Sequence, residues 1–197
     1  MTLVIGLQQF GVNRSSPATR SCHQLITIFN MSYSLQCLTY QQLQELATGQ
    51  LPTDLAARAA SGALPPDFVA ARALKHLNDG KSAFWCSSFI IVRDDDLRIV
   101  GGCGFKSEPL LGRVEIGYGV ASDHRRQGVA SAAVTSLLEL AFANGAIEVL
   151  AEILPDNMAS IATVRKAGFH PIGHRVAEDN ETVLQWIATK AKDHEAA

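Results

Sequence analysis

The chain has 197 residues, 47% of them hydrophobic, which is enough to build one sizeable core, so we expect a single domain. Its formal net charge of −2 provides no general attraction to nucleic acid or to membrane surfaces. No apolar run approaches the ~18 residues that a membrane-spanning helix requires. We therefore expect a protein that binds neither nucleic acid nor membrane.

The first thirty residues lack the patterns that predict helices and strands of the domain. Leu3-Val4-Ile5 is too brief for the apolar core of a secretory signal, and the polar segment ending at Pro17 interrupts regular structure. We expect residues 1–30 to be an N-terminal extension, flexible or laid on the surface. A single domain would then cover residues 31–190, followed by a short tail over 191–197.

From residue 31 onward the sequence predicts a series of helices and strands. A strand is expected over 34–38, and Thr39-Tyr40-Gln41-Gln42 has the form of a capping box that starts a helix, which Gly49 ends. The later expectations are a short helix within 52–64, a helix over 65–78, strands over 84–93, 97–105 and 113–120, a long helix from 128, a strand over 146–154, a helix over 157–167, and strands over 169–176 and 182–187.

The four cysteines (Cys22, Cys37, Cys86 and Cys103) show no CxxC or other metal-ligand spacing. They are typical of reduced, mostly buried thiols, and we expect no metal site. This use of cysteine favours a cytoplasmic protein.

A basic, glycine-containing turn joins the strand that ends at Val120 to the long helix. The first N–H groups of a helix lack intrahelical partners and its dipole favours negative charge, so such a turn can bind an anion. Gly128 lets the backbone approach a ligand closely, and Ala130 is small enough to keep the first turn open. The expected ligand is a phosphate or pyrophosphate, although a plain turn with solvated arginines would look similar.

Two motifs resemble those of the GNAT superfamily of N-acetyltransferases. Arg125-x-x-Gly128-x-Ala130 is similar to the Arg/Gln-x-x-Gly-x-Gly/Ala signature of the acetyl-CoA loop. Asn157-x-x-Ser160 is similar to the start of the next helix in that superfamily, and the Lys-x-Gly-Phe finish of that helix is also present. The two motifs occur in the right order with a strand between them.

The resemblance is clearest over residues 84–187 and implies the GNAT fold, an α/β (α+β) architecture with a mixed central sheet flanked by helices. It implies an acetyl-CoA-dependent N-acetyltransferase in which a primary amine, of a small molecule or a protein N-terminus, attacks the thioester directly. A monomer or a homodimer is compatible with it. The cofactor-binding residues that it implies are Val120, Arg125, Arg126, Gln127, Gly128, Val129, Ala130, Ser131 and Asn157.

In this family the strand before the turn splays away from the next strand, so its backbone pairs with the pantetheine arm and an N–H points at the thioester oxygen. Gly117 and Gly119 suit that role, because glycine within a strand often marks close approach of a ligand. The alternative is that both glycines relieve crowding on a packed face.

The acceptor amine must lose a proton before it attacks, so a carboxylate is expected nearby. Glu115, on the glycine side of the strand, is the first candidate for this base, and Glu152 on the following strand is the second. Either could instead be a solvated carboxylate or an ion-pair partner. Glu178 and Glu181 stay open as well.

Many members of the superfamily place a tyrosine four residues before the Gly-Phe pair to protonate the departing thiolate. Here the position holds Val164, which cannot donate. This departure resembles the ribosomal-protein-alanine N-acetyltransferase group, where Ser160 would be the donor and Asn157 would hold the pantetheine or the substrate. Both residues could also be simple helix caps.

Because the proton-transfer set is incomplete at Val164, a non-catalytic acyl-CoA-binding sensor or regulatory module of the same fold is the alternative function. A third possibility, an interaction protein with a degenerate cofactor loop, is disfavoured by the intact Arg125-x-x-Gly128-x-Ala130 motif. No pattern identifies the acceptor amine.

Overall fold

The structure is a computed structural model that describes residues 32–177 and 179–190. The expectations for the segments 1–30 and 191–197 and for Glu178 lie outside these ranges. The described strands are β1 (Tyr33–Cys37), β2 (Ser88–Arg93), β3 (Ile99–Phe105), β4 (Arg113–Val120), β5 (Glu148–Ile153), β6 (His170–Val176) and β7 (Thr182–Thr189). The described helices are α1 (Tyr40–Ala47), α2 (Thr53–Ala56), α3 (Asp67–Asn78), α4 (Ala83–Cys86), α5 (Val129–Ala143) and α6 (Met158–Lys166), and a 3-10 turn covers Ser122–His124.

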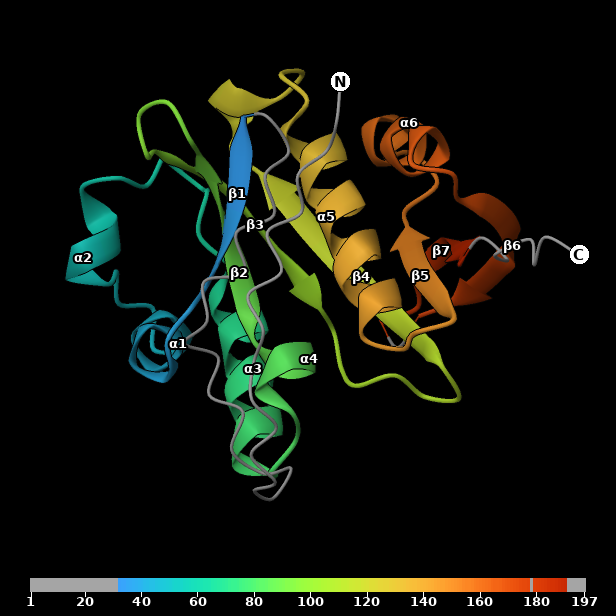
Figure 1. The fold of residues 1–197 in the computed structure, drawn as a ribbon, viewed down its shortest axis with the longest axis horizontal. Helices are drawn as coiled ribbons and strands as arrows, with labels where there is room; N and C mark the ends of the chain where they lie inside the picture. Colours follow the sequence, from blue (N-terminus) through green and yellow to red (C-terminus); the bar gives the residue numbers. More distant parts are fainter. Residues whose placement is uncertain (1–31, 178, 191–197) are drawn as a thin grey trace, which may run out of the picture.

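The strands form one mixed sheet in the order β1-β2-β3-β4-β5-β7-β6. Neighbouring strands are antiparallel except β4 and β5, which run parallel. A parallel pair needs a crossover connection, and α5 provides it between these two strands (Figure 1). The expected mixed sheet flanked by helices is confirmed.

Each face of the sheet has its own apolar layer. On one face α5 packs against β3 and β4, with Val134 and Leu137 completely buried. On the other face α1 and α3 pack against each other, and Leu43 is completely buried in a second cluster. Alternate residues of β2 serve the two clusters, Phe89 facing α5 and Ile90 facing α1 and α3, which is why this strand is a continuous apolar run.

The capping box at α1 is confirmed. The Thr39 hydroxyl accepts a hydrogen bond from the Gln42 N–H at 3.2 Å, and the Gln42 side-chain oxygen accepts one from the Thr39 N–H at 2.8 Å. These two bonds satisfy amides that the first helical turn leaves unpaired. The helix then buries Leu43 and Leu46.

The strand expected over 84–93 is wrong at its beginning, where residues Ala83–Cys86 form the short helix α4. The Cys86 N–H donates to the Ser82 carbonyl at 3.0 Å, which closes a helical turn. In this turn the Trp85 ring packs edge-on against the Phe105 ring, with centroids 4.9 Å apart. Aromatic packing at the end of β3 therefore overrides a local sequence that is equally compatible with a strand.

Two of the three described cysteines are buried; Cys37 is half-buried, and Cys22 lies outside the described residues. Cys86 and Cys103 lie in the core, and burial raises the pKa of both. Within residues 32–177 and 179–190, no group of three or more His, Cys, Asp or Glu side chains could hold a metal ion. None of the helices described is both long and apolar enough to cross a bilayer.

Candidate active site

The strands β4 and β5 separate before β4 ends. They are paired from Arg113 opposite Glu148 to Ile116 opposite Ala151, and no pairing follows. On its other side β4 stays paired with β3 as far as Val120. The stretch 117–120 therefore presents one edge of backbone polar groups that no strand satisfies. An unpaired edge of this kind can hydrogen-bond to an extended ligand.

A cavity of about 640 Å³ opens beside this edge, and we call it the α5–α6 cavity. It lies between the end of β4, the start of α5 and the first turns of α6. Its lining residues are Tyr118, Gly119, Val120, His124, Arg125, Arg126, Gly128, Val129, Ala130, Ser131, Asn157, Ala159, Ser160 and Thr163. The fold thus brings both sequence motifs to one cavity.

The loop at the start of α5 has an unusual backbone. Gly128 has φ of 84° and Arg126 has φ of 61°, so two residues close together adopt the left-handed conformation, which is uncommon for arginine. Within the described residues, none of the backbone N–H groups of residues 126–131 donates a hydrogen bond. Six consecutive free donors at a helix N-terminus are suited to bind phosphate oxygens.

The three side chains before Gly128 differ in their orientation. Arg125 and Arg126 line the α5–α6 cavity, and the Arg125 Nε also donates to the Val120 carbonyl at 3.3 Å. Gln127 does not line it, because its side-chain amide donates to the Asp123 carbonyl at 3.1 Å. The Gln127 backbone N–H, however, donates no hydrogen bond within the described residues.

The start of α6 forms the opposite wall. The Asn157 side-chain oxygen accepts a hydrogen bond from the Ser160 N–H at 3.1 Å, so Asn157 does cap the helix. The Tyr118 hydroxyl donates to the Ser160 carbonyl at 3.4 Å, and burial raises the pKa of this tyrosine. The Ser160 hydroxyl lies beside the Tyr118 hydroxyl, and hydrogen bonding between these two side chains lowers the pKa of Tyr118 in partial opposition to that burial. Two hydroxyl groups therefore lie at this end of the cavity.

A second cavity, of about 410 Å³, lies on the opposite face of the sheet, and we call it the α3 cavity. Its lining residues are Gly62, Ala63, Leu64, Pro65, Pro66, Phe68, Val69, Arg72, Ser88, Gly102, Cys103, Gly104, Phe105, Lys106, Gly117, Tyr118 and Gly119. It shares Tyr118 and Gly119 with the α5–α6 cavity, so the two meet at the point where β4 leaves β5.

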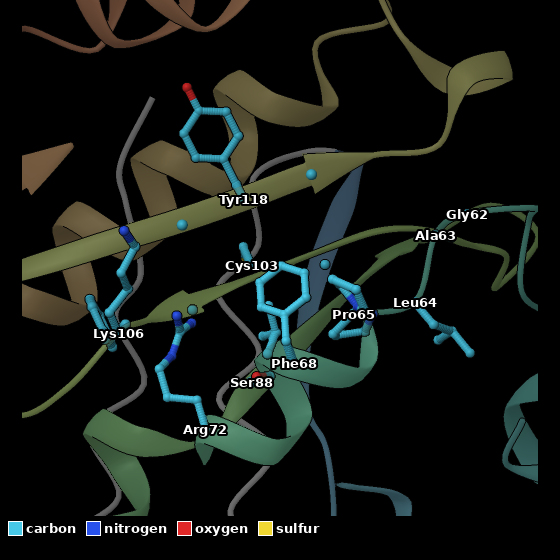
Figure 2. A pocket seen from close by; sticks show the side chains of 17 residues that line it. Gly62, Ala63, Leu64, Pro65, Phe68, Arg72, Ser88, Cys103, Lys106 and Tyr118 are labelled. Carbon is cyan, nitrogen blue, oxygen red and sulfur yellow. The ribbon is translucent and has the colours of Figure 1, made fainter. Parts of the chain in front are cut away.

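The floor of the α3 cavity is made of glycine. Gly102 is opposite Gly119 and Gly104 is opposite Gly117 in the ladder between β3 and β4. An added Cβ at Gly117 or Gly119 would meet no atom within 4 Å, so both positions open onto free space. The helix α3 supplies Phe68 and Arg72 on the cavity side of these glycines, while Tyr118 points away on the other side of β4 (Figure 2).

Three charged side chains stand at one end of the α3 cavity. Lys106 forms an ion pair with Glu115, while Arg72 has no hydrogen bond or ion pair within the described residues. Burial lowers the pKa of Arg72, and the charge of Glu115 partly opposes that shift. In Figure 2 Arg72 and Lys106 both point toward β4 from below. None of the described residues that line the cavity carries a carboxylate.

Glu152, the second candidate base, is engaged in a different interaction. Its two carboxylate oxygens accept hydrogen bonds of 2.5 Å from Arg175, and Gln185 donates to it at 3.0 Å. Burial alone would raise the pKa of Glu152, but these hydrogen bonds and the charge of Arg175 outweigh it and hold the pKa below its usual value. The geometry favours the ion-pair interpretation for this carboxylate.

Sequence reasoning missed Arg72 and Lys106 as parts of the site, and it assigned no role to Tyr118. Arg72 lies on an amphipathic helix where a charge usually faces solvent, and Lys106 lies in a loop. The alternation along β4 places Tyr118 on the side opposite Glu115, but it does not reveal that the first turn of α6 lies there. Only the tertiary arrangement brings these residues together.

Comparison with known proteins agrees with this geometry. Residues 43–170 match the sequence profile described as the acetyltransferase (GNAT) domain. The chain belongs to the GNAT acetyltransferase family. A curated relative of this GNAT protein is the uncharacterized N-acetyltransferase YjdG of Bacillus subtilis, 36% identical over 103 residues. That match covers 51% of this chain and 60% of the relative, so the chain spans less than two thirds of the relative's length.

Solved structures support the GNAT fold. The ribosomal-protein-S5-alanine acetyltransferase of Vibrio fischeri superposes with a TM-score of 0.61 at 12% identity, covering 85% of this chain and 98% of that one. A variant of spermidine N-acetyltransferase SpeG from Vibrio cholerae superposes with a TM-score of 0.60 at 15% identity, covering 83% and 96%. The first belongs to the group that the motifs resemble, and both likenesses concern the fold alone.

Proposed function

We propose that this GNAT protein is an acetyl-CoA-dependent N-acetyltransferase that acetylates a primary amine by direct attack on the thioester. The observation that carries the proposal is the joint position of two features. Residues 118–120 of the unpaired edge of β4 line the α5–α6 cavity, and so do five of the six residues with free amides, Arg126 and residues 128–131. The unpaired strand edge can hydrogen-bond to an extended pantetheine arm, and the free amides can bind a diphosphate.

The residues of the α5–α6 cavity fit coenzyme A. The amides of Gln127, Gly128, Val129, Ala130 and Ser131 would hold the diphosphate, with the guanidinium groups of residues 125 and 126 beside it. The edge of β4 up to Val120 would pair with the pantetheine, and Asn157 would contact it from α6. The thioester would then lie near Tyr118 and Gly119, where the two cavities meet.

The acceptor amine would reach this point from the α3 cavity. We propose Glu115 as the group that accepts the proton of the ammonium, because it lies on the same face of β4 as the glycine floor. Its contact with Lys106 orients the carboxylate. The neutral amine nitrogen then forms a bond to the thioester carbon, and the carbon–sulfur bond breaks.

The negative charges that develop would be met by donors around the junction. The carbonyl oxygen would accept a hydrogen bond from a free N–H of β4. The departing thiolate would receive a hydrogen bond from the Ser160 hydroxyl, which lines the cavity, and the second proton that the attacking nitrogen loses would pass to the sulfur. Tyr118, which burial keeps protonated, is a second donor at the same end of the cavity.

Calorimetry with acetyl-CoA tests the binding site directly. In a variant with Arg125→Glu and Gly128→Val, we expect the affinity to fall about tenfold or more, because the phosphate would face a negative charge and the left-handed position would carry a branched residue. Arg58→Glu, on the α2 side of the molecule, changes the charge by the same amount and is the matched charge control. Unchanged affinity in a folded double variant would refute the proposal.

Turnover tests the chemistry. Thiol release from acetyl-CoA in the presence of an amine panel should be measured for the protein and for Glu115→Gln. We expect the rate constant of the variant to fall by about a hundredfold or more, which is typical of a lost general base. Tight binding of acetyl-CoA without release on any amine would instead support the alternative function, a non-catalytic acyl-CoA sensor. The position held by Val164 keeps that alternative open.

A further inference from the structure

We propose that the α3 cavity selects an acceptor amine with an apolar body and a carboxylate group, and that Arg72 binds this carboxylate. The inference rests on the proposed function and assigns to it a class of acceptor. It follows from the charge, the walls and the position of the cavity.

The charge of the cavity is positive. Arg72 and Lys106 line it, and among the described residues no acidic side chain does. Lys106 is paired with Glu115, which leaves Arg72 without a partner among the described residues. Counting these three groups, two cations and one anion give a net charge of +1 at this end. A guanidinium half withdrawn from water binds a carboxylate well, because its planar fork can donate two parallel hydrogen bonds.

The walls of the cavity are apolar. Leu64, Pro65, Phe68 and Val69 cover it on the side of α3, and the glycine floor covers it on the side of the sheet. Such walls offer few partners to a substrate with many hydroxyl or ammonium groups, which would lose water without compensation. The volume of about 410 Å³ is within the range of small-molecule sites.

The position of Arg72 sets the orientation of the acceptor. The cavity meets the α5–α6 cavity at Tyr118 and Gly119, which is where the amine must arrive. Figure 2 shows Arg72 reaching up from α3 beside Lys106, under the part of β4 that precedes this junction. An acceptor with its carboxylate at Arg72 would therefore extend along the glycine floor with its amine toward the junction.

Polycationic acceptors are disfavoured by the same features. A polyamine or an aminoglycoside carries several positive charges and needs acidic side chains in its pocket. Here it would meet Arg72 and Lys106 instead. We expect such amines to be poor substrates.

Steady-state kinetics on an amine panel tests the inference. The panel contains free amino acids, linear ω-amino carboxylates of increasing length, short peptides, the corresponding amines without the carboxylate, spermidine and an aminoglycoside. We expect a carboxylate-bearing amine to have the highest kcat/KM. The free amino acids and the peptides distinguish a small metabolite from a peptide as the source of the carboxylate.

The decisive variant is Arg72→Met, which keeps an unbranched stem and removes the guanidinium group with its charge. For the best carboxylate acceptor we expect KM to rise by about ten- to a hundredfold with little change in kcat, while the KM for acetyl-CoA stays the same. Arg72→Lys should recover only part of the affinity, because it restores the charge without the fork. Lys75→Gln is the control, since Lys75 lies on the same helix, is largely exposed and pairs with Asp79.

The outcomes separate the two proposals. If acetyl-CoA does not bind, the proposed function fails. If the protein binds acetyl-CoA and acetylates spermidine or the aminoglycoside better than every carboxylate, the acceptor assignment is wrong while the function stands. An unchanged KM for the carboxylate acceptor in Arg72→Met would overturn the assignment as well.

Discussion

Glu115 and Glu152, the first and second candidates for the general base, have different surroundings. Glu152 is only 6% exposed and is held by Arg175 and Gln185. Glu115 lies on the strand face that forms the glycine floor and contacts a single lysine, Lys106. A carboxylate that is already saturated with donors is poorly placed to accept another proton, so the structural role fits Glu152 and the catalytic role fits Glu115.

For Glu152→Gln we expect a loss of about 1–3 kcal/mol in the free energy of unfolding at neutral pH, because Arg175 loses its charged partner. The folded-state pKa of Glu152 is lowered from 4.5, so the stabilisation is fully present above that value and disappears as the pH falls through the lower folded-state pKa. Denaturant unfolding at neutral and acidic pH should show the difference between the two proteins shrinking toward acid. A large drop in kcat with unchanged stability would instead make Glu152 the base.

Ser160 and Tyr118 can be separated by the leaving group. We expect Ser160→Ala to lower kcat by about ten- to a hundredfold, and Tyr118→Phe to lower it less, because Tyr118 already donates to the Ser160 carbonyl. Acyl donors whose thiol is more acidic need less protonation and should reduce the defect of the true donor. If that rescue occurs for Tyr118→Phe and not for Ser160→Ala, the tyrosine replaces the serine in this role.

Among single residues, those of the proposed cofactor loop could be predicted from the sequence, and those of the proposed acceptor site could not. Motif spacing found Gly128, Asn157 and Ser160 because they are local signals at the ends of helices. Arg72 and Tyr118 carry no local signal. Their importance comes from contacts across 40 or so residues of sequence, and only the pairing of β3 with β4 creates the floor between them.

Among the elements, the ladder between β3 and β4 has glycines with opposite purposes. A Cβ added at Gly101 would overlap the carbonyl oxygen of Gly119, so Gly101 is needed for close packing of the two strands. A Cβ at Gly119 would meet nothing within 4 Å and would project into the α3 cavity. Gly101 therefore allows close packing of the two strands, and Gly119 leaves space in the α3 cavity.

We therefore expect Gly101→Ala to destabilise the protein by about 1–3 kcal/mol, as overpacking usually does. Gly119→Ala should keep or slightly raise the stability, by up to about 1 kcal/mol, because it reduces the entropy of the unfolded chain. The same variant should raise the KM for the acceptor, since the methyl group occupies the floor. Thermal unfolding and kinetics on both variants check this contrast, and a destabilised Gly119→Ala with normal KM would contradict it.

The order of the elements was predictable because caps and periodicity mark them directly, as Thr39 and Asn157 do. The segment over Ala83–Cys86 was not. Its apolar residues are equally compatible with a strand and with a helix, and the edge-on packing of Trp85 against Phe105 favours the helix. That contact joins residues whose proximity depends on the finished sheet.

On the scale of the whole molecule, the family match covers residues 43–170, and the described lining residues of both cavities come after residue 31. We predict that deleting residues 1–30 leaves a folded protein that binds acetyl-CoA with the affinity of the full chain. Circular dichroism and calorimetry on the truncated chain measure this. Loss of folding would show that the domain begins earlier than residue 31.

The cavities on the two faces of the sheet meet only where β4 and β5 diverge, so neither reactant needs to pass through the site of the other. A donor and an acceptor that approach from opposite directions can be bound together, without a covalent acyl-enzyme between them. Initial-rate plots at several fixed concentrations of one reactant should then give intersecting lines and not parallel ones. An unreactive mimic of the acceptor should leave the entry route of the acyl donor unobstructed.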